Sequence, residues 1–408
     1  MQKQLRRHDA EESDVRSVPA ESLLMKIALV KRRYSLRHGG SERYCVNLSR
    51  TLTRMGHEVT VIGESIDADL VGEVRFIPVR VLRLSSSTRN RTFAENAGAA
   101  ARAGGYDVAY GLGRSYGLDA VRVTERLQSH WLNVYYRSGI SRFVQRNNPR
   151  HRTLIGLERD IYCAASTRRI ITQSQLDRLL VQEYYGVPAG KIHTVYNGVD
   201  ARLFHPGLRE HAGTVRRELG IASDVPLLVF ASMDFEGKGL RYILRALAGL
   251  RQQDATLAVL GKGPEAKFRR IAARLGIENR ILFAGRRNDI ERYYAAADLC
   301  VLPTAYEPFP NVNLEAMACG TPVVTTSTSG AADMVEHQRS GYLVSAVDAV
   351  EEIGTAIETC LNLSTAERAA MAARCREIAC SMTIEKNVEQ TVKILEEVRR
   401  EKLSVRAA

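Results

Sequence analysis

The sequence contains no long hydrophobic run, and this absence excludes one large class of proteins. No stretch among its 408 residues approaches the roughly 18 to 20 consecutive apolar residues that a membrane-spanning helix requires. The first 24 residues also contain no apolar block of the length found in signal peptides. We therefore expect residues 1–24 to form a disordered tail and the protein to stay in the cytoplasm.

Cysteine pairs with metal-binding spacing are also absent. The seven cysteines include no CxxC pair, and most of them lie among apolar neighbours, as in "DLCVLP". Such cysteines are typical of buried, reduced thiols in a cytosolic protein, so a structural zinc site is not expected.

Acidic residues are too few to balance the basic residues, and almost all of the excess positive charge lies in the first half of the chain. Residues 1–200 hold 31 Lys or Arg and 20 Asp or Glu, a net charge of +11, whereas the other 208 residues hold 27 and 26, a net charge of +1. A basic half indicates an acidic partner, which could be anionic lipid, a phosphorylated acceptor or nucleic acid. Nucleic acid is the weakest of these alternatives, because the sequence contains no recognisable nucleic-acid-reading module.

Two successive series of strand and helix patterns are present. "MKIALV" (25–30), a glycine-containing loop, a helical pattern and "HEVTVIG" (57–63) form the start of one α/β unit. The pattern restarts after "KIHTVYNGVDARLFHP" (191–206), where "PLLVFASM" (226–233) opens a second series of short apolar strands. This order predicts two doubly wound, Rossmann-like α/β domains.

The predicted boundaries follow from these series. An N-terminal domain spans residues 25–200, a C-terminal domain spans residues 201–380, and residues 381–408 form an amphipathic helix with no strand after it. We expect this helix to pack back on the first domain. Since ligands of such domains bind beyond the carboxyl ends of the strands, the crevice between the two domains is the expected ligand site.

Two glutamates in "YEPFPNVNLEAMACGTPVV" (306–324) are the first candidates for that site. The two prolines after Glu307 prevent a helix from running through this loop, so a helix begins near Asn311 and holds Glu315 in its first turns. The free N–H groups at such a helix start can hold a phosphate, and two nearby carboxylates suit the hydroxyl groups of a sugar and a ribose. A favourable interaction with the helix dipole is a simpler alternative for Glu315.

These motifs together resemble glycosyltransferase family 4, a family of retaining enzymes with the two-domain GT-B fold. The glutamate pair resembles the E-x7-E signature of that family, and the resemblance extends over about residues 25–400. Within the family, the sequence resembles lipopolysaccharide-core glucosyltransferases most. Five further segments occur in the family's order and approximate spacing: "HGGSERYCVNLSRTLTRMGHEVTVI", "VYNGVDARLFHP", "FASMDFEGKGLRYILRAL", "LAVLGKGPE" and "ILFAGRRNDIERYYAAADLCVLPT".

The resemblance assigns donor-binding roles to several residues. Glu307 would bind the hydroxyl groups of the donor sugar, and Glu315 would bind the ribose of the nucleotide. The backbone at Asn311 and Val312 would hold the distal phosphate, and the backbone around Gly285 in "AGRRND" would contact the base.

A lysine in "FEGKG" is implied as the main cation of the site. Lys238 matches the family lysine that neutralises the diphosphate leaving group, whose departure a positive charge favours. Many relatives carry an arginine five or six residues before this lysine, but Ser232 and Met233 stand at those positions here. Either another cation such as Arg241 replaces that arginine, or the diphosphate has fewer contacts than usual.

The first domain supplies candidates for the other side of the crevice. Gly39 and Gly40 in "RHGGSER" resemble the family's glycine loop, which lets the backbone approach the donor phosphate and the acceptor, although a Gly-Gly pair before a helix is also a common turn. Arg37, Glu42 and Arg43 are candidates for lining the acceptor side, with a solvated charge as the alternative for each.

Relatives place a histidine or aspartate near the donor sugar, in a segment that ends in a tryptophan. The corresponding segment here is "DAVRVTERLQSHWLN". Aligned on Trp131, the acidic position falls on Glu125 and the histidine position on Gln128, while His130 lies two residues further on. Glu125 and His130 are therefore both candidates for the catalytic group, and a structural histidine near Trp131 is the alternative.

No catalytic metal and no other cofactor is expected beyond the nucleotide-sugar co-substrate. The triplet Asp67-Ala68-Asp69 could suggest a manganese site. It follows the second strand of the first domain, however, and no other cluster of oxygen ligands accompanies it, so a surface loop is the simpler interpretation.

A basic amphipathic segment, "YYRSGISRFVQRNNPRHRT" (135–153), repeats arginine every four or five residues with apolar residues between them. Such a segment suits anionic headgroups, and a solvated helix face is the alternative. Together with the basic first half, it predicts peripheral attachment to the inner face of the cytoplasmic membrane, where a lipid-linked, phosphorylated saccharide would be presented.

The residues and the resemblance thus predict a metal-independent, retaining hexosyltransferase of lipopolysaccharide biosynthesis. It would move glucose from UDP-glucose to a lipid-linked saccharide. Two alternatives stay open at this point: a nucleotide-sugar epimerase of the same fold, and a non-catalytic protein that binds a nucleotide-sugar or a lipid.

Overall fold

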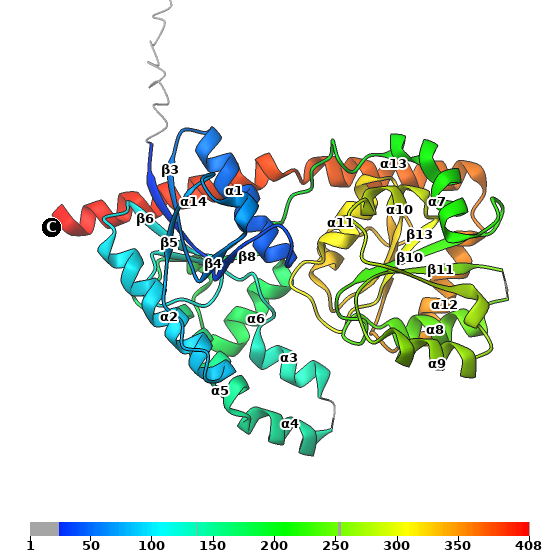
Figure 1. The fold of residues 1–408 in the computed structure, drawn as a ribbon, viewed down its shortest axis with the longest axis horizontal. Helices are drawn as coiled ribbons and strands as arrows, with labels where there is room; N and C mark the ends of the chain where they lie inside the picture. Colours follow the sequence, from blue (N-terminus) through cyan, green and yellow to red (C-terminus); the bar gives the residue numbers. More distant parts are fainter. Residues whose placement is uncertain (1–23, 137, 252–253, 408) are drawn as a thin grey trace, which may run out of the picture.

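The computed structural model describes residues 24–136, 138–251 and 254–407, which form two parallel β-sheets with helices on both faces of each (Figure 1). The predicted tail lies outside these described residues, apart from Leu24. The two sheets confirm the predicted pair of doubly wound, Rossmann-like domains.

The first domain is built on a seven-stranded sheet with the order β5-β3-β1-β6-β7-β8-β9. All of its neighbouring strands run parallel, and a two-stranded sheet of β2 and β4 lies beside it. The strands are β1 (Lys26–Val30), β2 (Arg33–Tyr34), β3 (Glu58–Gly63), β4 (Ser65–Ile66), β5 (Arg75–Pro78), β6 (Val108–Gly111), β7 (Ala120–Arg122), β8 (Arg169–Thr172) and β9 (Ile192–Thr194). The helices are α1 (Gly40–Arg54), α2 (Ser86–Ala103), α3 (Gln128–Tyr135), α4 (Gly139–Asn147), α5 (Pro149–Tyr162) and α6 (Gln175–Tyr185).

The second domain is built on a six-stranded parallel sheet with the order β12-β11-β10-β13-β14-β15. Its strands are β10 (Leu227–Ser232), β11 (Thr256–Gly261), β12 (Ile281–Gly285), β13 (Leu299–Leu302), β14 (Val323–Thr326) and β15 (Gly341–Val344). Its helices are α7 (Ala212–Leu219), α8 (Leu240–Gly249), α9 (Glu265–Arg274), α10 (Ile290–Ala296), α11 (Asn311–Ala318), α12 (Val350–Leu361) and α13 (Thr365–Ser381).

Strand β1 shows why short apolar runs form these sheets. Ile27 and Leu29 pack into the core on one face of the sheet, and Ala28 and Val30 pack into the core on the other face. Because helices cover both faces, successive side chains are buried although they point in opposite directions. Each fully buried aliphatic side chain of this size contributes roughly 1.5 to 3 kcal/mol to folding.

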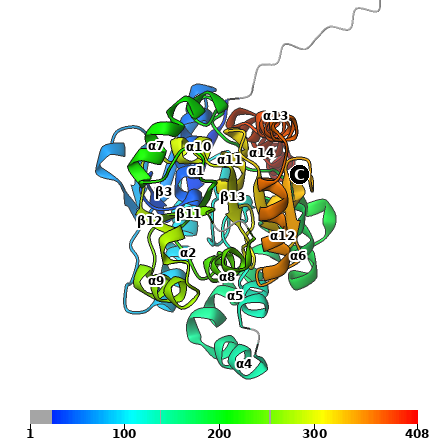
Figure 2. The ribbon, with the colours of Figure 1, turned by 90° about the vertical axis from the view of Figure 1, so that its right-hand side faces the viewer.

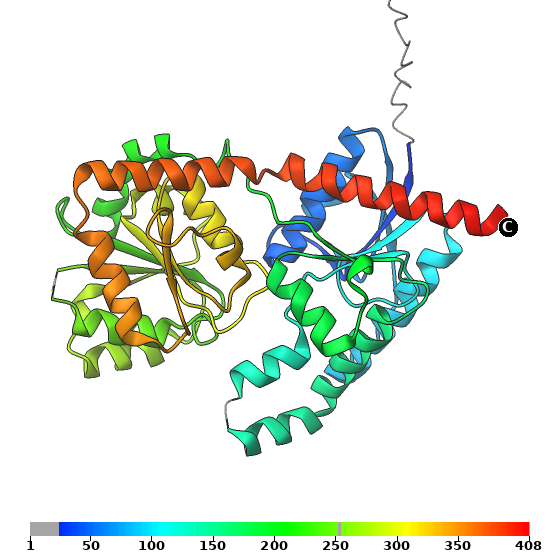
Figure 3. The same ribbon diagram turned by 180° about the vertical axis from the view of Figure 1, so that it is seen from behind.

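The last helix, α14 (Ile384–Ala407), returns to the first domain, as predicted. Val388, Val392, Leu395 and Val398 belong to the same apolar cluster as the side chains of β1 and α1. Figure 3 shows α13 along the second domain and α14 along the first, in one continuous band.

The chain therefore passes between the domains twice, after β9 and between α13 and α14. The two passages lie side by side, because Val199 N donates a hydrogen bond to the carbonyl of Met382 at 3.0 Å. A Cβ on Gly198 would lie 2.3 Å from the backbone of Thr383, so only glycine fits where they cross.

Three helices, α3, α4 and α5, lie between β7 and β8. Figure 2 shows that α4 projects from the body of the first domain, and no residue of α4 is buried. Among the described residues, no helix is both long enough and apolar enough to cross a membrane.

Candidate active site between the two domains

Glu307 lies where the two domains meet. It follows β13 in the loop that leads to α11, and Pro310 directly precedes the first helical residue, Asn311, as predicted. The Oε2 atom of Glu307 accepts one hydrogen bond from Lys238 Nζ at 2.6 Å and another from Arg126 Nε at 3.1 Å. Lys238 belongs to the second domain and Arg126 to the first, so one carboxylate holds a cation from each side.

The charges around Glu307 shift one another's protonation. Burial raises the pKa of the Glu307 carboxyl, but Lys238 and Arg126 outweigh this effect and bring the pKa below its ordinary value. Burial lowers the pKa of the Lys238 amine, and Glu307 only partly offsets this. The positive charge of Lys238 thus depends on a nearby anion, an arrangement typical of functional sites in crevices.

Gly330 holds the loop that carries Glu307 in place. Gly330 N donates to the Glu307 carbonyl at 2.9 Å. A Cβ on Gly330 would lie 1.8 Å from the carbonyl oxygen of Pro308, so the loop packs directly on this glycine.

A tyrosine anchors the same loop to the first domain. The Tyr306 hydroxyl donates to Asp177 Oδ1 at 2.7 Å, and its side chain is buried in a cluster of first-domain residues. Nearby, Gln175 N donates to Asp333 Oδ2 at 2.6 Å, again across the domain boundary. Glu307 is therefore positioned by contacts with both domains.

A pocket of about 450 Å³ lies beside the start of α11 and is lined by both domains. We call it the nucleotide-side pocket. Gly40, at the start of α1, and Asn311, at the start of α11, both line it, and a Cβ on Gly40 would lie 3.2 Å from Asn311 Nδ2. Gly39 is the extended N-cap of α1. The predicted glycine loop and the predicted phosphate-binding helix start thus face each other.

Glu315 lines the nucleotide-side pocket together with Arg43. As expected, Glu315 lies in the first turns of α11, one turn after Asn311, although the first turn itself contains no acidic residue. Burial raises the pKa of the Glu315 carboxyl, and Arg43 acts in the opposite direction. Val312 follows Asn311 in the first turn, as the loop prolines led us to expect.

Gly285 ends β12 with a φ of 69°, in the left-handed region that favours glycine. It directs the chain into the loop whose Arg286, Arg287 and Asn288 line the nucleotide-side pocket. Arg286 Nη2 also donates to the Arg37 carbonyl at 2.7 Å, which joins the two domains at this edge.

Two of the three residues expected on the acceptor side line the nucleotide-side pocket. Arg37 and Arg43 line that pocket. Arg37 also pairs with Asp69 at 3.1 Å, and the Glu42 carboxylate accepts a hydrogen bond from Ser41 at 2.8 Å. A role of these three residues toward an acceptor stays a prediction.

A second cavity, of about 730 Å³, adjoins Glu307. Apart from Glu307, every residue that lines it belongs to the first domain. We call it the arginine pocket, because six arginines line it: Arg32, Arg83, Arg89, Arg114, Arg126 and Arg150.

Of the two candidates for the first-domain catalytic group, only Glu125 lines the arginine pocket with Glu307. Glu125 is ion-paired with Arg114, and its side chain is 45% exposed. Burial raises the pKa of its carboxyl, but Arg114, Lys31 and Arg32 bring the pKa below its ordinary value. An ionised carboxylate at this position can accept a hydrogen bond or a proton.

His130 has different surroundings. Its ring packs edge-on against Tyr306 at a centroid distance of 4.6 Å and also contacts Tyr184. Burial lowers the pKa of His130 to about 4, so the ring is neutral at physiological pH. It lies behind the Glu307 loop and lines neither of the two pockets described here.

Arg126 was not singled out from the sequence. It donates to Glu307 and, through Nη1, to Asp234 Oδ2 at 3.2 Å, and its guanidinium lies 4.3 Å from the ring centre of Trp131. Arg241, the replacement that the sequence suggested, instead pairs with Glu236 at 2.7 Å. Arg126 immediately follows Glu125 in a segment already expected near the donor, and this was the signal that could have found it.

The Asp67-Ala68-Asp69 triplet has structural partners. Asp67 accepts a hydrogen bond from the Ser35 hydroxyl at 2.6 Å, and Asp69 holds Arg37. Within the described part of the chain, no three His, Cys, Asp or Glu side chains are grouped as metal ligands would be.

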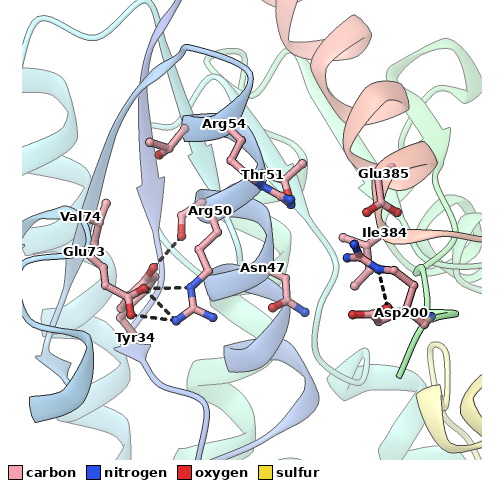
Figure 4. Close-up of a pocket in the computed structure, with 13 residues that line it drawn as sticks. Tyr34, Asn47, Arg50, Thr51, Arg54, Glu73, Val74, Asp200, Ile384 and Glu385 are labelled. Atoms are coloured by element: carbon pink, nitrogen blue, oxygen red, sulfur yellow. Dashed lines mark hydrogen bonds and ion pairs between the residues drawn. The ribbon is translucent and has the colours of Figure 1, made fainter. Parts of the chain in front are cut away.

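A further pocket lies against α1 and α14 (Figure 4). Its prominent charges are already paired, since Arg50 Nε donates to Glu73 at 2.9 Å. None of the predicted site residues lines this pocket.

Two family models match the chain. Residues 38–203 match the one described as Glycosyltransferase Family 4, and residues 225–362 match the one described as Glycosyl transferases group 1. A probable transglycosylase of Burkholderia thailandensis is 32% identical over 302 residues, which are 73% of this chain and 76% of that protein.

Solved structures share the fold. The lipopolysaccharide glucosyltransferase WaaG of Escherichia coli is 24% identical over 333 residues, 80% of this chain and 87% of that protein. A crystal structure of WaaG superposes with a TM-score of 0.78 over 90% of this chain and 99% of that one. HepE of Anabaena in complex with UDP-glucose has a TM-score of 0.69 and 22% identity, over 93% of this chain and 100% of that one. These likenesses confirm the predicted two-domain GT-B fold.

Proposed function

The chain belongs to glycosyltransferase family 4, and we propose that it is a retaining enzyme that moves glucose from UDP-glucose to a lipid-linked saccharide of the lipopolysaccharide-core type. The observation that carries this proposal is the Glu307 carboxylate held between Lys238 and Arg126, where it lines the arginine pocket and lies in the loop that leads to the helix start beside the nucleotide-side pocket. The names of two similar proteins support it, since WaaG is a lipopolysaccharide glucosyltransferase and HepE was solved with UDP-glucose.

In this proposal, Glu307 keeps two cations in place until the donor arrives. The diphosphate of the donor then takes over Lys238 and Arg126, and the released carboxylate accepts hydrogen bonds from the sugar hydroxyls. The backbone N–H groups at Asn311 and Val312 bind the distal phosphate, and Glu315 binds the ribose.

The chemical step would proceed on one face of the sugar. As the bond to the diphosphate breaks, negative charge develops on the leaving oxygen, and Lys238 and Arg126 stabilise it without a metal ion. The leaving phosphate oxygen takes the proton of the acceptor hydroxyl as that hydroxyl attacks from the same side. Glu125 lines the cavity from which the acceptor would approach, and this favours it over His130 as the group that orients the acceptor.

Helix α4 supports a peripheral location on the inner face of the cytoplasmic membrane. Ile140, Phe143 and Val144 are 81%, 70% and 57% exposed, although they are apolar. Arg146 in the same helix and Arg150 just after it are exposed basic residues. Apolar side chains with arginines beside them suit the boundary between acyl chains and anionic headgroups.

Turnover of a panel of nucleotide-sugars, with and without lipid-linked saccharides extracted from the cells of origin, tests this function. We expect UDP-glucose to be consumed and labelled glucose to appear in the lipid fraction only when the extract is present. Conversion of UDP-glucose without any acceptor would indicate an epimerase, and no consumption of any donor would refute the enzymatic proposal.

A matched pair of variants tests the site. Glu307→Ala should abolish transfer, whereas Glu73→Ala, which removes a carboxylate paired with Arg50 in the remote pocket of Figure 4, should leave transfer unchanged. Normal turnover by a correctly folded Glu307→Ala variant would overturn the assignment of the site.

A further inference from the structure

The arginine pocket has more guanidinium groups than its carboxylates can pair one to one. Arg114 is paired with Glu125 and Glu158, and Arg126 with Glu307 and Asp234. Arg83 and Arg89, by contrast, share the single carboxylate of Glu64. The excess therefore lies on the side of the pocket formed by the loop before α2 and by α2 itself.

Two further arginines of the pocket form no ion pair with a carboxylate within the described part of the chain. Arg32 Nη1 donates to the side-chain oxygen of Asn90 at 3.0 Å, which is a neutral group. The guanidinium of Arg150 makes neither an ion pair nor a hydrogen bond with any described residue and is exposed. Both side chains are available to a ligand.

The surroundings of Arg32 are unfavourable for its positive charge. Burial lowers its pKa, Glu125 acts against this, and the neighbouring positive charge of Arg89 lowers the pKa further. Two guanidinium groups close together in a partly buried place are stabilised when an anion binds between them.

We propose that the arginine pocket binds an anionic substituent of the acceptor saccharide, a phosphate or a carboxylate, and that Arg32, Arg89 and Arg150 select it. This inference rests on the proposed transferase function. Guanidinium groups form paired hydrogen bonds with both kinds of anion, so the two share one recognition chemistry.

The position of the pocket fits an acceptor rather than a donor. It contains Glu307, where the donor sugar would lie, but not Glu315, Asn311 or any other residue of the nucleotide-side pocket. Arg150 is the second residue of α5, a helix that follows α4 after a single intervening residue, Asn148. An acceptor presented at a membrane by α4 would therefore meet Arg150 on its way to Glu307.

Transfer kinetics with chemically altered acceptor extracts test the proposal. The extract is used untreated, after phosphatase treatment, and after amidation of its carboxylates. The variants are Arg32→Gln and Arg150→Gln, with Arg91→Gln as the matched control, because Arg91 is exposed on α2 and lines a different pocket. UDP affinity is measured for every variant.

With untreated extract, we expect Arg32→Gln and Arg150→Gln each to lower kcat/KM for the acceptor about 10- to 100-fold, the effect of losing one charge-assisted hydrogen bond. UDP affinity and the control variant should match the wild type. On the extract that lacks the recognised anion, the wild type should fall to the rate of the variants. Loss in the phosphatase arm identifies a phosphate, and loss in the amidation arm identifies a carboxylate.

Equal use of all three extracts by the wild type, with both variants as active as Arg91→Gln, would overturn the inference while the transferase function stands. Because Arg150 is exposed and its side chain has no partner among the described residues, a lowered kcat/KM of Arg150→Gln for the acceptor cannot be attributed to misfolding. Absence of any transfer by the wild type would count against the function itself.

Discussion

Replacement of Arg126 by glutamine should weaken catalysis more than donor binding. The Arg126 side chain is 25% exposed and bonds Glu307 at 3.1 Å and Asp234 at 3.2 Å. A hydrogen bond between charged groups contributes about 1.5 to 3 kcal/mol, and partial exposure places this one at the lower end. Since donor binding exchanges the Glu307 contact for a phosphate contact, we expect UDP affinity to fall only about 10-fold.

The expected effect on kcat is larger. The leaving phosphate oxygen gains negative charge in the transition state, and Glu307 no longer competes with it for Arg126. Loss of one preorganised donor at such a position costs about 2.7 to 4 kcal/mol, or roughly 100- to 1000-fold in kcat. The assay combines calorimetric titration with UDP and with uridine, and single-turnover transfer of labelled glucose. Uridine, which lacks phosphate, should bind the variant and the wild type equally.

Arg241→Gln is the matched control, since Arg241 lies near Lys238 in the chain but pairs with Glu236. If Arg241→Gln loses UDP affinity and kcat while Arg126→Gln keeps both, the reasoning is refuted and Arg241 is the missing cation. If both variants bind and turn over normally, Lys238 and the helix start suffice for the diphosphate.

Three further predictions concern the Glu307 loop and α4. Burial raises the pKa of Asp177 to about 8 in the folded protein, so the stability linked to its protonation is complete below its ordinary pKa and is lost as the pH rises toward 8. The free energy of unfolding of Asp177→Asn, measured relative to that of the wild type by thermal denaturation, should therefore rise by more than about 1.4 kcal/mol between pH 4 and pH 8. The same difference at both pH values would contradict this. Gly330→Ala forces a Cβ against the Pro308 carbonyl and should reduce kcat at least about 10-fold with a lower Tm, whereas unchanged kinetics would show that the loop can move. Ile140→Ser with Phe143→Ser should weaken sedimentation with anionic vesicles while the affinity for UDP stays that of the wild type, and unchanged sedimentation would exclude α4 as the attachment site.

The features of the site that could be predicted were those that depend on neighbouring residues in the chain. Two prolines after Glu307 determine where α11 begins, and β1 could be recognised because its apolar run is buried on both faces. The same prolines put Glu315 in the first turns of α11, because they define where the helix can start.

Contacts between the domains were harder to predict. Arg126 and Glu307 are 181 residues apart, and no local pattern links them. Arg37 and Arg43 were expected to line the acceptor side; Arg37, just before α1, and Arg43, within α1, both line the pocket beside the start of the second domain's α11, and their role toward an acceptor stays a prediction. Which wall of a crevice a side chain lines depends on how two separately folded sheets are placed against each other.

The return of α14 to the first domain also determines how the protein can be divided. A fragment that ends near residue 200 would lack Val388, Val392, Leu395 and Val398, and the apolar surface of β1 and α1 that they cover would face water. We expect such a fragment to aggregate. A fragment of residues 201–381, by contrast, keeps the helices that cover its own sheet and should be expressed as a monomer. The two domains thus differ in their ability to fold alone. The first domain can be produced by itself only if α14 is joined to it, for example by circular permutation at the nearby crossing of Gly198 and Thr383.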